Sequence, residues 1–212
     1  MPFVGYLLYQ GAWPWGLGAL LGATASAYWT HRTWSAWALP TPFGRYPFEF
    51  AVGVRQYLVV IVLLYALLLK GVQVGNGNLS AVAFGGLWVL VSGFYTTPEP
   101  LTYVWWHRHS ARLFLGYKIG IAFGYSLLLT APAMAVLLWQ FGSAYAWALL
   151  GITGSGAFLL TLLLLGKYTA FPEPMGVPHF IWLALSIAFP PLLLVLWGVF
   201  YRRACANLET LL

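Results

Sequence analysis

The sequence contains very little charge. Only 7% of its 212 residues are Asp, Glu, Lys or Arg, whereas 61% are hydrophobic. A soluble domain carries about 25% charged residues, and a chain of this size cannot cover a water-facing surface with so few. The composition therefore excludes a water-soluble fold and predicts an integral membrane protein.

Other residue types are absent or nearly so, and each absence removes a class of chemistry. The chain has no Asp, which excludes the Asp-rich magnesium-diphosphate sites of prenyl transferases. Cys205 is the single cysteine, so there is no internal disulfide and no thiolate metal site. A Gly-x-x-x-x-Gly-Lys loop is also missing, so the chain is not itself a P-loop ATPase.

Histidine is scarce as well. His31, His107, His109 and His179 are the four histidines, and all lie near predicted membrane boundaries. His107 and His109 are two residues apart, so on a helix they point about 200° away from each other and cannot share an ion. We therefore expect no metal, no cofactor and no enzymatic activity.

What charge there is has a basic excess, with ten Lys and Arg against four Glu. These basic residues lie between apolar runs, where the positive-inside rule places them in cytoplasmic loops. The basic balance thus indicates membrane orientation and contact with lipids rather than binding of nucleic acid.

A spanning helix needs about 20 mainly apolar residues, and six segments of the chain meet this requirement. They are roughly residues 4–29, 50–69, 79–95, 114–139, 145–165 and 180–201. Small residues in runs such as "GATASA" and "GITGSGA" favour close packing of these helices. We predict a single all-α transmembrane domain over residues 1–212 with about six transmembrane helices.

Prolines and two cations lie inside the predicted spans. Pro132, Pro190 and Pro191 should kink or interrupt their helices, either as ordinary packing kinks or as hinges that line a path. Arg55 and Lys118 are within about two turns of a span end, so their side chains can reach the interface. No Glu lies at the middle of a span, which argues against a proton- or ion-coupled transporter.

The distribution of basic residues predicts the orientation. The loops after the first, third and fifth spans carry most of them, and the other side has Lys70 and the C-terminal pair. The residues counted in the odd-numbered loops are Arg32, Arg45, Arg108, Arg112 and Lys167. This predicts a multi-pass protein of the plasma (inner) membrane with cytoplasmic odd-numbered loops and both termini outside.

The segment "TPEPLTYVWWHRHSARLFLGYK", residues 97–118, concentrates charge between two apolar runs. Thr97 is a candidate helix cap and Pro98 a candidate first-turn residue. From Trp106 onward Arg108 and Arg112 share a polar arc backed by aromatic and aliphatic residues. This pattern predicts an amphipathic helix over about residues 98–113 that lies in the membrane interface.

At these residues the chain resembles the membrane subunits of ABC-2-type transporters, which include six-helix haem-exporter permeases. Glu99, Leu101, Lys118 and Pro132 match the family's Glu-x-Leu, a Lys early in the next helix and a later Pro. The resemblance covers about forty residues. It departs from the family in lacking a Pro inside the coupling segment and in having three spans before it instead of two.

The resemblance implies a permease-like subunit whose cytoplasmic coupling helix docks a separate P-loop ATPase in a homo- or hetero-oligomer. The partner-coupling residues would be Glu99, Arg108, Arg112 and Lys118. A second interfacial helix before residue 50 would carry Arg32, Arg45 and Glu49.

Two other interpretations stay open on the sequence. The chain is equally suited to be a non-catalytic structural subunit of a larger membrane complex, which explains its small-residue faces and lack of chemistry. Alternatively, Glu99, His107, Arg108 and His109 form an interfacial site of a lipid-modifying enzyme, with histidine as general base and arginine as phosphate clamp.

Overall fold

The computed structural model describes residues 48–106, 110–188 and 190–211, and the regular elements in these ranges are all helical. The all-α prediction is therefore confirmed for this part of the chain. Contacts divide the chain into two units, residues 1–40 and 41–212, and the single domain expected from the sequence stays a prediction. The first predicted span, Arg32 and Arg45 lie outside the described residues.

The helices are α3 (Phe48–Gln56), α4 (Leu58–Gln73), α5 (Gly77–Gly93), α6 (Leu101–Trp106), α7 (Ala111–Phe141), a 3-10 turn η1 (Ser143–Tyr145), α8 (Ala146–Ala170), α9 (Val177–Ala188) and α10 (Pro190–Glu209).

Two of these helices are long and apolar enough to cross a membrane. Helix α7 has 31 residues and α8 has 25, which at 1.5 Å per residue gives lengths of roughly 46 and 37 Å. Helices α3 and α4 pass the same test together but are bent by 70° at their junction. The described residues thus provide two spans, or three with the bent pair, and the predicted total of six stays a prediction.

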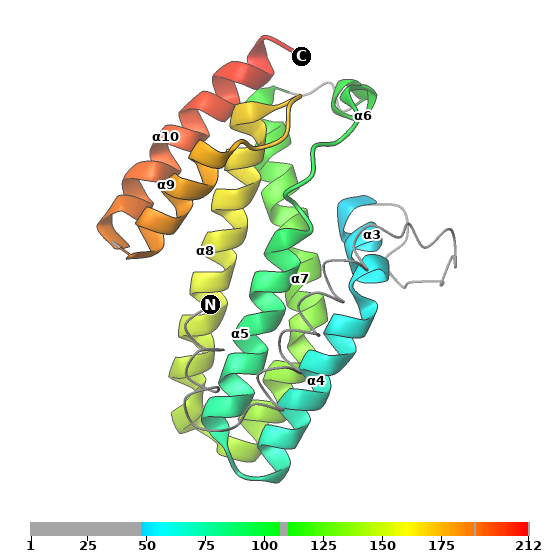
Figure 1. The fold of residues 1–212 in the computed structure, drawn as a ribbon, viewed down its shortest axis with the longest axis vertical. Helices are drawn as coiled ribbons and strands as arrows, with labels where there is room; N and C mark the ends of the chain where they lie inside the picture. Colours follow the sequence, from blue (N-terminus) through cyan, green and yellow to red (C-terminus); the bar gives the residue numbers. More distant parts are fainter. Residues whose placement is uncertain (1–47, 107–109, 189, 212) are drawn as a thin grey trace, which may run out of the picture. The chain divides into compact units, whose positions relative to one another are not determined.

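Helices α4, α5, α7 and α8 lie side by side and form the body of the described structure (Figure 1). At one end, which we call the turn end, residues 74–76 join α4 to α5 and residues 142–145 join α7 to α8. Gly75 and Gly142 have positive φ there, at 70° and 74°, a conformation that glycine adopts without steric cost. The Tyr145 hydroxyl donates to the Gly77 carbonyl and ties the two turns together. The opposite end, which we call the α6 end, holds α6, the segment that precedes it and the segment between α8 and α9 (Figure 1).

Helix α5 is the most enclosed element of the bundle. Its side chains Phe84, Leu87, Trp88 and Val91 are at most 1% exposed. Helix α8 approaches it closely at Gly156, where a Cβ atom would lie 2.5 Å from Cγ of Trp88. A glycine at this position is what allows the indole to pack against the α8 backbone, as in other small-residue helix contacts.

The sixth predicted span, residues 180–201, is not one helix. Helix α9 ends at Ala188 and α10 begins at Pro190, so the break falls at the proline pair, where the ring removes a backbone donor and obstructs the preceding turn. The two helices then pack against each other, and α10 packs against α8 (Figure 1). By contrast, Pro132 lies inside α7 without ending it. The hinge role of these prolines stays a prediction.

The predicted interfacial helix over residues 98–113 is also different in the structure. Pro98, Glu99 and Pro100 are not helical, and α6 covers only Leu101–Trp106. The reason is steric, because a proline disfavours helical conformation in the residue before it, and two prolines surround Glu99. Ser110 is extended, with φ −57° and ψ 145°, and precedes α7, so Arg112 belongs to the first turn of α7.

Candidate functional site

Four charged side chains meet inside the bundle near its α6 end. Lys118 contacts Glu49 at 3.0 Å and also pairs with Glu99. Lys167 pairs with Glu49 and lies 3.5 Å from Glu99. Each lysine therefore contacts both carboxylates, and the formal charges sum to zero. We call these four residues the four-charge cluster.

The cluster is assembled from four separate parts of the fold. Glu49 lies in the first turn of α3, and Glu99 lies in the non-helical segment just before α6. Lys118 is in the second turn of α7, and Lys167 is in the last turn of α8. The segment before α6 thus has charged contacts with α7 and α8, and the same two lysines connect it to α3.

All four side chains are almost completely enclosed. Lys167 is 1% exposed, Lys118 4%, and the two glutamates 7% each. Removing such charges from water is costly unless each is paired and hydrogen-bonded. The reciprocal pairing meets that condition, which explains how a chain with so few charges tolerates four of them inside a helical bundle.

Tyrosines complete the surroundings of the cluster. The Tyr168 hydroxyl donates to Glu99 at 3.2 Å. The Tyr95 side chain is 1% exposed, and its hydroxyl has no hydrogen-bond partner among the described residues. Burial raises the pKa of Tyr95, and the negative charges of Glu49 and Glu99 raise it further. Tyr95 therefore stays protonated and neutral beside the carboxylates.

Glu99, which lies outside the spanning segments, is held in its ionised form. Burial alone would raise the pKa of its carboxyl, but the positive charges of Lys167 and Lys118 and the hydrogen bond from Lys118 outweigh that effect. The pKa of Glu99 is lowered to about 2. At neutral pH this carboxylate is charged and available to both lysines.

A small pocket of about 120 Å³ borders the cluster. Glu49 and Glu99 line one part of it, and Gln56, Thr96 and Thr97 contribute further polar groups. Because both carboxylates are already engaged by lysines, the pocket wall is polar but not strongly anionic.

The structure brings together three of the residues singled out in the sequence, but in a way the sequence did not predict. Lys118 does not extend to the interface as expected, because Glu49 and Glu99 hold its ammonium group inside the bundle. Glu49 is likewise buried in the cluster rather than placed along an interfacial helix. Glu99 and Lys118 pair with each other, so neither presents an exposed side chain to a partner.

Lys167 was assigned to a loop by the sequence and is in fact the most enclosed member of the cluster. It lies three residues before the end of α8. A lysine that directly follows the apolar run "LLLLG" was the available signal, since an ionisable residue in an apolar helix needs a partner.

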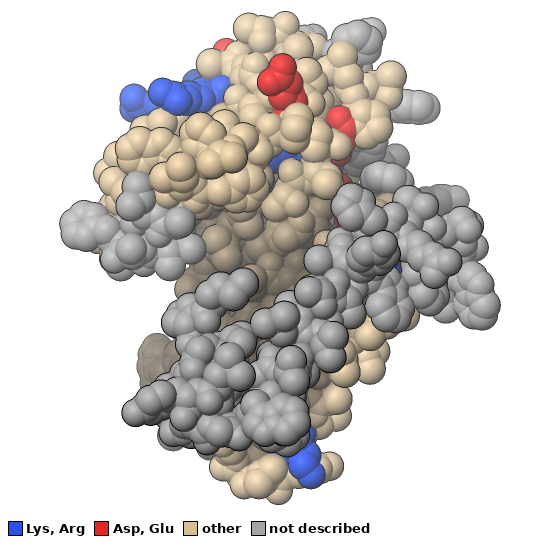
Figure 2. Space-filling view, in the orientation of Figure 1, with Lys and Arg blue, Asp and Glu red and all other residues tan. Residues whose placement is uncertain are grey.

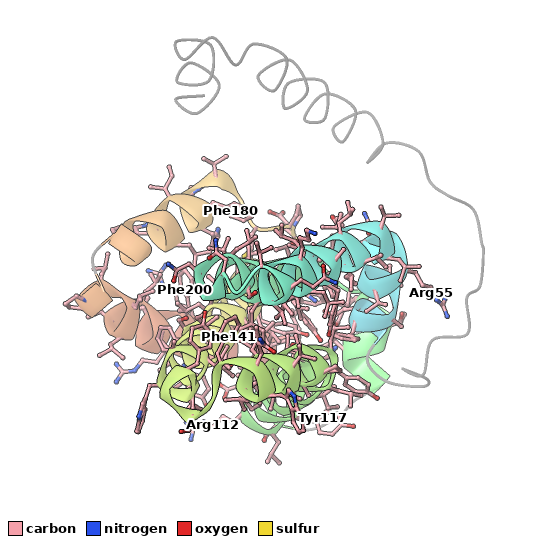
Figure 3. All side chains as sticks on the ribbon, turned by 90° about the horizontal axis from the view of Figure 1, so that it is seen from below. Arg55, Arg112, Tyr117, Phe141, Phe180 and Phe200 are labelled. Atoms are coloured by element: carbon pink, nitrogen blue, oxygen red, sulfur yellow. The ribbon has the colours of Figure 1, made fainter. Side chains whose placement is uncertain are left out.

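The arginines of the chain are distributed differently from the lysines of the cluster. Arg55 and Arg112 are exposed and project from different sides of the bundle (Figure 3). Arg108, His107 and His109 lie outside the described residues. The predicted partner-coupling set is therefore divided between a buried pair and an exposed arginine on α7.

His179 is the histidine that the structure describes, and its side chain contacts neighbouring residues of the bundle. Nε2 of His179 lies 3.1 Å from the Thr169 hydroxyl, and its ring is 6.1 Å from that of Phe200. Among the described residues, no three His, Cys, Asp or Glu side chains are grouped so that they could hold a metal ion.

Comparison with known proteins gives no relative. No family model, no curated protein and no solved structure matches the chain.

Proposed function

We propose that the chain is a permease-like membrane subunit of an ATP-driven transporter of the ABC-2 type, with a separate P-loop ATPase as its partner. It would reside in the plasma membrane as a multi-pass protein within a homo- or hetero-oligomer. The observation that carries the proposal is the way in which α6 is connected to the bundle.

Charged residues lie on both sides of helix α6 in the sequence. Glu99 precedes it by two residues, and Lys118 follows within the second turn of α7. These two side chains pair with each other, so the short helix and its flanking segments form a loop closed by an ion pair. A displacement of α6 is therefore passed directly to α7.

The same attachment reaches α3 and α8. Lys118 also contacts Glu49, and Glu49 in turn pairs with Lys167. A helix that docks an ATPase must transmit motion to the spanning helices, and a rigid charged cluster behind it meets that need. In this proposal Glu99 and Lys118 transmit movement from inside the bundle, while Arg108 and Arg112 contact the partner.

The proposal is tested by purifying the tagged full-length chain from its native membrane in mild detergent and identifying what co-purifies by mass spectrometry. We expect a stoichiometric P-loop ATPase. The double variant Arg108→Glu/Arg112→Glu should reduce its recovery at least tenfold, because two attractive charges become repulsive.

The matched control is Arg202→Glu/Arg203→Glu, which reverses two adjacent exposed charges on α10 and should leave recovery unchanged. Absence of an ATPase from the wild-type preparation would overturn the proposal. Recovery with other membrane proteins alone would instead support the non-catalytic structural subunit.

A further inference from the structure

Helices α9 and α10 form a hairpin whose two arms run in opposite directions. The ring of His179, near the start of α9, is 6.1 Å from that of Phe200, in the second half of α10. The chain reverses direction between α9, which ends at Ala188, and α10, which begins at Pro190. Figure 1 shows α9 leading away from the α6 end and α10 leading back to it.

The apolar parts of the two arms are equally long and both too short to span. Helix α9 has 12 residues, Val177–Ala188, and in α10 the apolar stretch from Pro190 ends before Arg202 and Arg203. Twelve helical residues extend about 18 Å, whereas the hydrocarbon core of a bilayer is about 30 Å thick. The turn of the hairpin is therefore too close to its polar ends to reach the far side.

The polar ends of both arms lie at the α6 end of the bundle. Nδ2 of Asn207 donates to the carbonyls of Tyr168 and Phe171, at 3.1 and 2.6 Å. These contacts place the last part of α10 beside the last turn of α8. Glu173, in the segment between α8 and α9, is exposed in the same region.

The face of the hairpin turned away from the bundle is apolar. Phe180 on α9 is 46% exposed, whereas Phe200 on α10 is buried (Figure 3), within 3.3 Å of a Cβ built on Gly166. Among the side chains that the structure describes on the two arms, the other large apolar ones that are exposed are Val177, Ile181, Trp182, Leu194, Val195, Trp197 and Val199. This face is suited to lipid acyl chains.

The start of α10 fits a location without water. The first four N–H groups of a helix have no partner within it, and such groups are costly in hydrocarbon. Pro190 and Pro191 have no N–H, so the number of unpaired donors at this helix start falls from four to two.

We propose that α9 and α10 form a re-entrant hairpin that enters the bilayer from the α6 end, contacts the acyl chains of one leaflet, and returns the C-terminal residues to the side of entry. The C-terminus then lies on the same side as the four-charge cluster. The sequence had predicted a crossing at residues 180–201, with Arg202 and Arg203 on the opposite side.

Site-directed labelling tests this topology in the full-length chain. Cys205 is replaced by Ser, and single cysteines are placed at three exposed positions: Thr210 after α10, Glu173 before α9 and Gln73 at the turn end. A membrane-impermeant maleimide is applied to right-side-out and inverted vesicles. We expect Thr210→Cys and Glu173→Cys to react in the same vesicles, and Gln73→Cys in the other kind.

Reaction of Thr210→Cys together with Gln73→Cys would show that residues 177–209 cross the membrane and would overturn the proposal. A fourth variant, Ile181→Cys, tests insertion, since a residue in acyl chains is unreactive from either side until detergent is added. Its reaction in the vesicles that label Glu173→Cys would place α9 outside the bilayer and would equally overturn it. If the cysteine replacement impairs folding, an epitope placed after Leu212 of the chain that retains buried Cys205 reports the same sidedness to an antibody.

Discussion

At the scale of single residues, the cluster is sensitive because its charges balance. Replacement of a buried ion pair by apolar groups is often neutral, but removal of one partner leaves an uncompensated buried charge. In this protein the balance involves two carboxylates and two ammonium groups, all less than a tenth exposed. The energetic effect of a substitution therefore depends on the charge that remains.

Lys167→Met removes the most enclosed ammonium group and leaves two carboxylates with one lysine. We expect it to lower the free energy of unfolding by about 3–5 kcal/mol. The double variant Glu49→Gln/Lys167→Met restores neutrality, with Glu99 and Lys118 still paired, and should recover a large part of that loss. Denaturant-induced unfolding in mixed micelles measures both effects.

Lys70→Met is the control for this double-mutant cycle. Lys70 is exposed in the last turn of α4, where a single surface charge contributes little. Equal destabilisation by Lys70→Met and Lys167→Met, or additivity of the two cluster substitutions, would contradict the role of the cluster.

The sequence predicted some of these residues but not their association. Glu99 and Lys118 were singled out by a motif, and Glu49 as part of a second interfacial helix that the family resemblance implies. Lys167 was counted only as a loop charge. Ion pairing between residues separated by 118 positions depends on how four segments fold together, and no local pattern in the sequence contains that information.

At the scale of the elements, the contact between α5 and α8 depends on one glycine. Gly156 faces Trp88 so closely that an added methyl group would lie 2.5 Å from the indole. Gly151 of the same helix differs in this respect, since a Cβ on it meets no atom within 4 Å. Replacing glycine by alanine is thus expected to lower the stability of the protein at Gly156 but not at Gly151.

Gly156→Ala should destabilise the protein by about 1–3 kcal/mol, because overpacking forces the helices apart. Gly151→Ala should be neutral or stabilise by up to about 1 kcal/mol through its helix propensity. Thermal unfolding in the same detergent compares them directly. A stabilising Gly156→Ala would show that α8 does not approach Trp88 in this way.

Element prediction succeeded where one apolar run corresponds to one helix. Residues 79–95 and 145–165 match α5 and α8 closely. The prediction failed at residues 180–201, where two short apolar helices follow each other in the sequence. Together they form an apolar run as long as a single spanning helix, so composition alone does not distinguish the two cases. Hydrophobic length does not record a reversal of direction, and the proline pair was the local sign of one.

At the scale of the whole molecule, the basic residues are unevenly divided between the two ends. Among the described residues, Lys70 lies near the turn end. The others lie toward the α6 end, namely Arg55, Arg112, Lys118, Lys167, Arg202 and Arg203. Figure 2 shows the separated groups of Lys and Arg side chains on one face. Because Arg202 and Arg203 also lie toward the α6 end, the excess of basic residues at that end is greater than the sequence alone suggested.

By the positive-inside rule this asymmetry predicts that the α6 end faces the cytoplasm. In intact cells, an impermeant maleimide should therefore label Gln73→Cys and should label Glu173→Cys only after the membrane is permeabilised. The reverse pattern would show that the α6 end faces outward, and an ATPase in the cytoplasm could not then reach α6.

The pairing within the cluster also has a consequence for biosynthesis. The chain emerges from the ribosome with Glu49 first, then Glu99 and Lys118, and Lys167 last. Until Lys167 has been made, two carboxylates share one ammonium group, and their burial in the bundle is unfavourable. The charged end of the bundle therefore closes late, after α8 is complete, whereas the apolar contacts of α4 with α5 need no later segment.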